Sequence, residues 1–187
     1  RRHSFPTRRS SDLEGFDDGT NNHTYAELDG KTTIAAKAVN IAASKGMIVC
    51  VSAGNEGNKT WKYLGTPADA DSAFTIGAVD ANGDTSSFTS YQFENTTKVK
   101  PNVVAMGTAT QYLNSANTIS SGNGTSYSTP VIAGLTACLW QAFPEKTNWE
   151  IKTAIEQSAH LYPNTDNKRL GYGIPDFEKA YKYGLKN

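Results

Sequence analysis

The sequence predicts an α/β fold with a mostly parallel sheet flanked by helices, and two observations lead to this class. Short apolar runs that suit strands alternate along the chain with segments of helical periodicity. The first such run, Met47–Val51, is apolar without interruption, as strands buried on both faces of a parallel sheet are. Alternation of this kind is typical of α/β proteins.

The elements follow in order. After a polar loop at 14–30, apolar residues at helical spacing predict an amphipathic helix from Ile34 to about Lys45, capped by Thr32 or Thr33 and stopped by Gly46. Strands are expected at Met47–Val51, Phe74–Val79 and Val103–Ala105.

Three helices are expected in the second half of the chain. Pro130–Phe143 is apolar all round, which predicts a buried helix. Asn148–His160 is amphipathic with Asn148 as its cap, and Phe177–Tyr183 forms a last short helix. Cys50 and Cys138 fall in buried elements and are expected to be small core hydrophobes, with a disulfide between them left open.

Composition and charge exclude several classes of protein. The chain has 187 residues, with 18 basic and 18 acidic side chains, so it lacks the basic excess of a nucleic-acid-binding protein. No stretch approaches the roughly 18 consecutive apolar residues of a membrane-spanning helix. Two cysteines are too few for a disulfide scaffold.

The first thirteen residues differ from the rest. Residues 3–13 read HSFPTRRSSDL, which matches the translation of a common sequencing adapter; a basic arm or targeting peptide is the alternative. We therefore expect 1–13 to be an artefact and 14–187, with a net charge of −3, to be the protein's own. On this interpretation the natural protein begins upstream and the chain is a fragment.

The strongest local motif is GNGTSYSTP at 122–130, which leads directly into the apolar helix. Ser126 would lie at a helix N-terminus, where free N–H groups and the positive end of the dipole favour a developing anion. An acyl-transfer nucleophile needs such surroundings. The alternative is that Thr125 or Ser126 only caps the helix.

The second motif is SAGNEGN at 52–58, directly after the first predicted strand. Ligands of open α/β folds bind at the carboxyl ends of strands, and Asn55 would lie there. Its amide is a neutral donor suited to an oxyanion. The alternative is a plain Gly/Asn turn.

Taken together, the two motifs resemble the subtilisin-like serine peptidases. The segments TIGAVD at 75–80, SSFTS at 86–90 and KPNV at 100–103 extend the resemblance in family order over nearly all of 14–187. It implies that Ser126 is the nucleophile, and that the Asn55 side chain and the Ser126 N–H form the oxyanion hole.

The resemblance also implies how a substrate binds. Ser52, Ala53 and Gly54 would form one wall of the S1 pocket and pair with a polypeptide in extended conformation, with Gly124 and Thr125 beside the same pocket. Trp61–Thr66 would lie near its base. Three positions depart from the family pattern without being catalytic: Gln92, Asn102 and Met106.

The acid and the base of the family's triad are not found. They precede the serine in this family, and the base lies in a His-Gly-Thr motif, but no histidine here is followed by glycine. His23, His160 and the Asp18-Gly19-Thr20 sequence are interpreted as loop or helix-end residues. Because an unactivated serine is a poor nucleophile, we expect the chain alone to show no appreciable peptidase activity.

Further expectations rest on the family or remain open. Most bacterial members are secreted or lie at the cell surface, and many bind structural calcium, but no cofactor is identified and no cluster has metal-ligand spacing here. The fragment should expose an apolar edge and aggregate. An α/β-hydrolase esterase and a non-catalytic scaffold with the subtilase fold are the alternatives. The sequence does not predict the oligomeric state.

Overall fold

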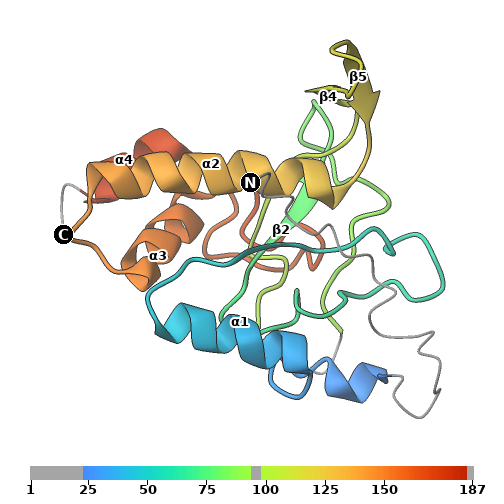
Figure 1. The fold of residues 1–187 in the computed structure, drawn as a ribbon, viewed down its shortest axis with the longest axis horizontal. Helices are drawn as coiled ribbons and strands as arrows, with labels where there is room; N and C mark the ends of the chain where they lie inside the picture. The colour runs from blue at the N-terminus through green and yellow to red at the C-terminus, as the bar shows by residue number, and fades with distance from the viewer. Residues whose placement is uncertain (1–22, 94–97, 185–187) are drawn as a thin grey trace.

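The computed structural model describes residues 23–93 and 98–184, and a parallel sheet with helices on both faces forms its centre (Figure 1). The strands β1 (Cys50–Ser52), β2 (Phe74–Val79) and β3 (Val103–Met106) lie in the order β1-β2-β3. Cys50 pairs with Phe74, and Ile76 pairs with Val103. The predicted α/β class with a parallel sheet is confirmed.

Helices cover the sheet unequally. Helix α1 (Ile34–Ser44) packs on one face through a small cluster with Ala70 and Ala73. The larger core lies on the other face, where α2 (Thr125–Ala142), α3 (Asn148–Ser158) and α4 (Phe177–Gly184) meet the strands. Its members include Phe74, Ile76, Val103, Ile132, Leu139 and Ile155.

The start of α1 and the middle strand agree with prediction. Thr33 is the cap of α1, and its hydroxyl accepts a hydrogen bond from Ala36 N at 3.1 Å. Gly46 follows the helix with a φ of 90°, a conformation that favours glycine. All six residues of β2 are buried, and β3 extends one residue further than predicted.

The prediction for the first strand was wrong in position and in burial. The strand covers Cys50–Ser52, and all three residues are only half-buried. It lies at an edge of the described sheet and pairs with β2 alone, so no described strand pairs with its outer edge. Burial nevertheless raises the pKa of the Cys50 thiol to about 11.

Helix α2 was also predicted incorrectly in part. It begins at Thr125, before Pro130, and it is not buried all round. Val131 and Leu135 are 43% and 41% exposed, and Cys138 lies at the surface. Cys138 is therefore not a core residue, and both cysteines are free.

The cap of α3 is one residue earlier than predicted. Thr147 caps the helix and forms a capping box with Glu150. Asn148 instead donates hydrogen bonds to Ala43 O and Met47 O, at 2.9 and 3.0 Å, and so ties α3 to the end of α1. Helix α3 ends at Ser158, two residues before the predicted end.

The sequence did not predict two elements. The antiparallel hairpin β4 (Thr110–Leu113) and β5 (Ile119–Gly122) projects beside the N-terminal end of α2 (Figure 1). A short 3₁₀ helix, η3, covers Tyr25–Glu27. No helix in the described part of the chain is long and apolar enough for a membrane crossing. The predicted artefact at 1–13 and the Asp18-Gly19-Thr20 loop lie outside the described residues.

Candidate active site

Ser126 is the second residue of α2, and it is exposed. Gly124 is the N-cap of the helix and provides no side-chain hydrogen bond, so the prediction that Thr125 or Ser126 merely caps the helix is wrong. The first N–H groups of a helix have no partner within it. The Ser126 hydroxyl therefore lies beside backbone donors and the positive end of the helix dipole.

Asn55 lies three residues after β1, at the carboxyl end of the strand. Its Oδ1 atom accepts hydrogen bonds from Thr125 N at 3.0 Å and from Thr125 Oγ1 at 3.1 Å. These two bonds fix the orientation of the amide, because they place the oxygen toward Thr125 and turn Nδ2 away from it. Among the described residues, Nδ2 has no hydrogen-bond partner.

Gly124 brings Asn55 and Ser126 together. A Cβ atom added at Gly124 would lie 3.1 Å from Ser126 Oγ and 3.3 Å from Asn55 Nδ2, so both polar groups face the space above this glycine. The Gly124 N–H donates a hydrogen bond to Gly107 O at 2.8 Å, which fixes the backbone at this position. A larger residue at 124 would crowd both groups.

Thr125 connects the two motifs. Its side chain is 1% exposed, and its Oγ1 accepts a hydrogen bond from Gly54 N at 3.1 Å while donating to Asn55. The Ser52 and Thr129 hydroxyls, 2.9 Å apart, add a second link between β1 and α2. These bonds hold the loop after β1 against the first turn of α2.

The predicted pocket wall has a distinctive hydrogen-bond pattern. Ala53 is fully buried and packs against Leu64, which places part of the predicted segment 61–66 beneath the wall. Gly54 uses both of its backbone groups inside the protein, because its N–H donates to Thr125 Oγ1 and its carbonyl accepts from Ser90 N at 3.0 Å. Gly54 therefore supports the site through internal bonds, which corrects the expectation that its backbone pairs with an extended substrate.

Ser90 is a positioning residue that sequence reasoning missed. It is fully buried; its N–H holds Gly54 O, and its hydroxyl accepts from Glu56 N at 3.0 Å. These bonds fix the loop on both sides of Asn55. The serine-rich segment at 86–90 was the available signal, but it indicated only resemblance and not this contact.

Neither described histidine contacts Ser126. His23 lies 3.4 Å from Glu27, and His160 Nδ1 accepts a hydrogen bond from Ile174 N at 2.9 Å. Both imidazoles are thus engaged elsewhere. Within 23–93 and 98–184, no side chain forms a hydrogen bond with the Ser126 hydroxyl, so no base is identified there.

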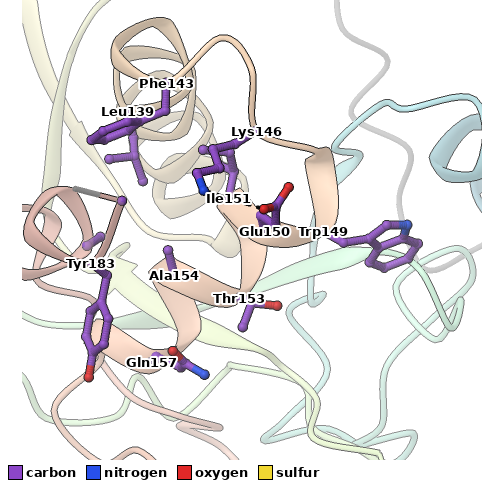
Figure 2. Close-up of a pocket in the computed structure, with 12 residues that line it drawn as sticks. Leu139, Phe143, Lys146, Trp149, Glu150, Ile151, Thr153, Ala154, Gln157 and Tyr183 are labelled. Carbon is purple, nitrogen blue, oxygen red and sulfur yellow. Dashed lines mark ion pairs between the residues drawn. The ribbon is translucent and has the colours of Figure 1, made fainter. Parts of the chain in front are cut away.

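A cavity of about 360 Å³ lies at the other end of α2, between α2, α3 and α4 (Figure 2). Apolar residues such as Leu139 and Ile151 line it, and the Lys146–Glu150 ion pair of 3.6 Å lies among the lining residues. Because Ser126 is at the opposite end of the helix, this cavity is separate from the candidate site. The described residues hold no group of three or more His, Cys, Asp or Glu suited to a metal.

Comparison with known proteins places this geometry in a family. Residues 16–173 match the Subtilase family. The chain is 33% identical over 144 residues to M-protease from Shouchella clausii, covering 77% of this chain and 35% of the relative. It is 31% identical over 150 residues to Subtilisin DY from Bacillus licheniformis, covering 80% and 52%. The chain thus spans about half or less of the length of these relatives.

Solved structures support the same fold. The patellamide maturation protease PatA matches with a TM-score of 0.67 and 20% identity, covering 85% of this chain and 59% of that one. A protease from Pseudoalteromonas arctica matches with a TM-score of 0.62 and 24% identity, covering 79% and 46%. The family match excludes the α/β-hydrolase alternative. This chain belongs to the subtilase family of serine peptidases.

Proposed function

We propose that the chain supplies the nucleophile and the oxyanion hole of a serine endopeptidase, which cleaves peptide bonds through an acyl-enzyme on Ser126. The observation that carries the proposal is the orientation of Asn55, whose Oδ1 is held by Thr125 while Nδ2 faces the space beside Ser126 Oγ. A fixed neutral donor beside a serine at a helix N-terminus suits the tetrahedral intermediate of acyl transfer.

In this mechanism the Ser126 oxygen attacks the substrate carbonyl, whose oxygen becomes negatively charged. Asn55 Nδ2 and the Ser126 N–H stabilise that charge. The C–N bond then breaks, the amine half of the substrate leaves with the proton that came from the Ser126 hydroxyl, and water releases the acyl group from Ser126. These steps need a group that takes the proton from Ser126 as a general base and gives it to the leaving amine as a general acid, and no described side chain is hydrogen-bonded to Ser126 in that role. We therefore propose that this chain alone is inactive and that residues outside it complete the triad.

The substrate would be a polypeptide in extended conformation. Ser52, Ala53 and Gly54 would form one wall of the pocket for the residue before the scissile bond, with Gly124 and Thr125 beside it. The burial of Ala53 and the internal bonds of Gly54 support a rigid wall. We also propose, from family membership, that the protein is exported or lies at the cell surface and that it binds structural calcium.

Two experiments test the proposal. A fluorophosphonate probe should leave Ser126 of the 187-residue chain essentially unlabelled, and stoichiometric labelling would contradict the predicted inactivity. In a longer chain that includes the upstream region, Ser126→Ala should abolish peptidase activity. There, Asn55→Ala should lower turnover by about 10²–10³-fold with little change in KM; this magnitude is the one known from subtilisin itself and is carried over as a family expectation.

A non-catalytic module with the same fold is the second candidate. The observation that favours it is the absence of a base near Ser126 within the described residues. If the longer chain bound peptides but neither cleaved them nor reacted with the probe, the scaffold would be the better description. An Asp and a His-Gly-Thr motif upstream would favour the enzyme.

A further inference from the structure

An arginine from the loop between α3 and α4 reaches the loop that contains Asn55. Arg169 is the only arginine in residues 14–187, where lysine supplies the other basic side chains of this kind. Its Nη2 atom donates a hydrogen bond to Gly57 O at 2.9 Å, and its Nη1 atom donates to Ser87 O at 3.0 Å. The guanidinium thus joins two loops, since Gly57 belongs to the loop after β1 and Ser87 lies beyond β2.

The guanidinium is itself held in place by its surroundings. It is half-buried and lies over the ring of Tyr91, with 4.7 Å between the guanidinium carbon and the ring centroid. The Arg169 N–H donates to Asn167 Oδ1 at 3.0 Å. The Tyr172 N–H donates to Asn102 O at 2.9 Å, which ties the same loop to the start of β3. Arg169 therefore extends from a fixed part of the fold.

The two carbonyl groups lie on the loops that fix Asn55. Gly57 follows Asn55 by two residues, and its N–H donates to Phe88 O at 2.8 Å. Ser90 binds the same loop through Gly54 O and Glu56 N, as described above. Arg169 holds the outer end of this loop, at residue 57, whereas Ser90 holds residues 54 and 56. The loop is thus fixed on both sides of Asn55 by two different segments of the chain.

The shape of the arginine side chain suits this set of contacts. The acceptors are two neutral carbonyl oxygens on different loops, and two different nitrogens of one planar group reach them. A lysine would keep the positive charge but supply a single nitrogen on a flexible stem. Arg169→Lys therefore separates the geometry of the contact from its charge.

We propose that Arg169 is a positioning residue of the oxyanion hole. By holding Gly57 against Ser87, it fixes the outer end of the Asn55 loop and keeps Asn55 Nδ2 beside Ser126 Oγ. The inference rests on the proposed function, because Nδ2 has an oxyanion to stabilise only if Ser126 attacks a substrate. Such a donor must stay within about 0.5 Å of its productive place, which requires supporting contacts of this kind.

The first test measures whether Arg169 acts through Asn55. In the longer chain that includes the upstream region, kcat and KM are compared for the wild type, Arg169→Lys, Asn55→Ala and the double variant. Because the donor remains but is held less firmly, Arg169→Lys should lower kcat by about tenfold and change KM by less than about twofold. In the Asn55→Ala background the same substitution should change kcat by less than about twofold, since no donor is left to position. An equal fall in both backgrounds, or none in either, would overturn the proposal.

The second test does not depend on catalysis, so it decides the proposal even if the longer chain is inactive and the proposed function fails. Hydrogen exchange in the 187-residue chain is followed by mass spectrometry for residues 54–58 and for α3. Arg169→Lys should speed exchange in 54–58 by about tenfold and leave α3 unchanged. Lys168→Met is the matched control, because it removes a charge from the exposed neighbouring residue, and it should change neither segment.

Two results of this second test would contradict the proposal. Unchanged exchange in 54–58 would mean that Arg169 does not hold the Asn55 loop, and an equal rise in α3 would mean that it only stabilises the fold. Tyr91→Leu replaces Arg169→Lys if the latter does not fold. It removes the ring beneath the guanidinium and leaves both carbonyl partners in place, so 54–58 should again exchange faster while α3 does not.

Discussion

The contribution of Asn102 to the stability of the fold is expected to depend on Glu156. This dependence can be measured by replacing the side-chain nitrogen of Asn102 with oxygen. Asn102 Nδ2 donates to Glu156 Oε1 at 2.8 Å, while Asn102 Oδ1 accepts from Thr75 and Lys100. Asn102→Asp keeps the acceptor but replaces the donor with oxygen, so two carboxylates would meet at the distance of a hydrogen bond. We expect this variant to be destabilised because Glu156 is present.

The size of the effect follows from the distance and from proton uptake. Two like charges 2.8 Å apart repel by about 6 kcal/mol at an effective dielectric constant near 20. Glu156 can avoid this repulsion by binding a proton, which costs ~1.4 kcal/mol for each pH unit above its pKa. From the ordinary value of 4.5, that cost is at most ~3.5 kcal/mol at neutral pH. Burial already raises the pKa of Glu156, which makes its protonation less costly. We therefore expect a coupling free energy of about 2–3 kcal/mol between residues 102 and 156.

The assay is a double-mutant cycle of urea unfolding with Asn102→Asp, Glu156→Gln and the double variant. The glutamine amide can donate to the carboxylate introduced at position 102 and restore the bond, so the double variant should be more stable than the two single effects predict. In Asn102→Asp the folded-state pKa of Glu156 lies above its unfolded value. The deficit in stability should therefore be small in mild acid and grow as the pH rises through that raised pKa.

Two results would refute this reasoning. A coupling below about 0.5 kcal/mol would mean that the carboxylates avoid each other by moving apart. A deficit independent of pH between mild acid and neutrality would mean that Glu156 takes up no proton. Asn102→Ala is the matched control, because it removes the hydrogen bond without adding a charge and should show little pH dependence.

Three further predictions concern other parts of the chain. Thr125→Val should lower the free energy of unfolding in urea by about 1–2 kcal/mol, because it removes the hydroxyl that bonds Gly54 and Asn55. Thr125→Ser should keep most of that stability. An equal loss in both variants would show that these hydroxyl bonds do not stabilise the fold. The Thr147 N–H lowers the pKa of Glu150, so the Glu150 carboxylate should contribute to the free energy of unfolding above pH 4.5 and lose that contribution in acid. Glu150→Gln should remove this acid dependence, and an unchanged pH profile of stability would refute the prediction. The 187-residue chain should aggregate, and the exposed apolar side chains Val131 and Leu135 of α2 are one surface that can cause this. Leu135→Glu should then lower light scattering, and unchanged scattering would assign aggregation to another surface.

The resemblance to the subtilisin-like peptidases predicted that Asn55 and Ser126 lie together although about seventy residues separate them, and two local rules agree with it. One places a loop at the carboxyl end of a strand, and the other places a serine at the start of a helix. Neither rule includes the side chain that joins the two motifs. Thr125 was expected only beside the pocket, whereas its hydroxyl determines which way the Asn55 amide points.

Burial was predicted less well than element type. Apolar composition shows that α2 can be buried, but not which of its faces has a neighbour. Val131, Leu135 and Cys138 illustrate this, since they lie on a helix of the main core and remain exposed. The same holds for β1, whose apolar run indicates a buried strand although its outer side is open.

Errors of one or two residues arose where a tertiary contact decides between two good local choices. Asn and Thr both cap helices well, so the sequence 147–148 allows either. Thr147 caps α3 because the Asn148 amide is used to bind Ala43 and Met47, about a hundred residues earlier in the chain. The β4-β5 hairpin was missed because its strands carry few of the aliphatic residues on which the prediction relied.

The two ends of the sheet explain why the departure at Asn102 leaves the candidate site intact. At the amino-terminal end, Asn102 and Lys100 bind Thr75 and so fix where β3 lies against β2. At the carboxyl end, Gly107 N donates to Val79 O, and Gly107 O receives the Gly124 N–H beside Ser126. The alignment of β2 and β3 is therefore transmitted to the nucleophile through backbone bonds. An asparagine at position 102 can hold the amino-terminal ends of β2 and β3 together as long as Glu156 accepts the hydrogen bond from its Nδ2. Residue 102 must therefore be interpreted together with residue 156.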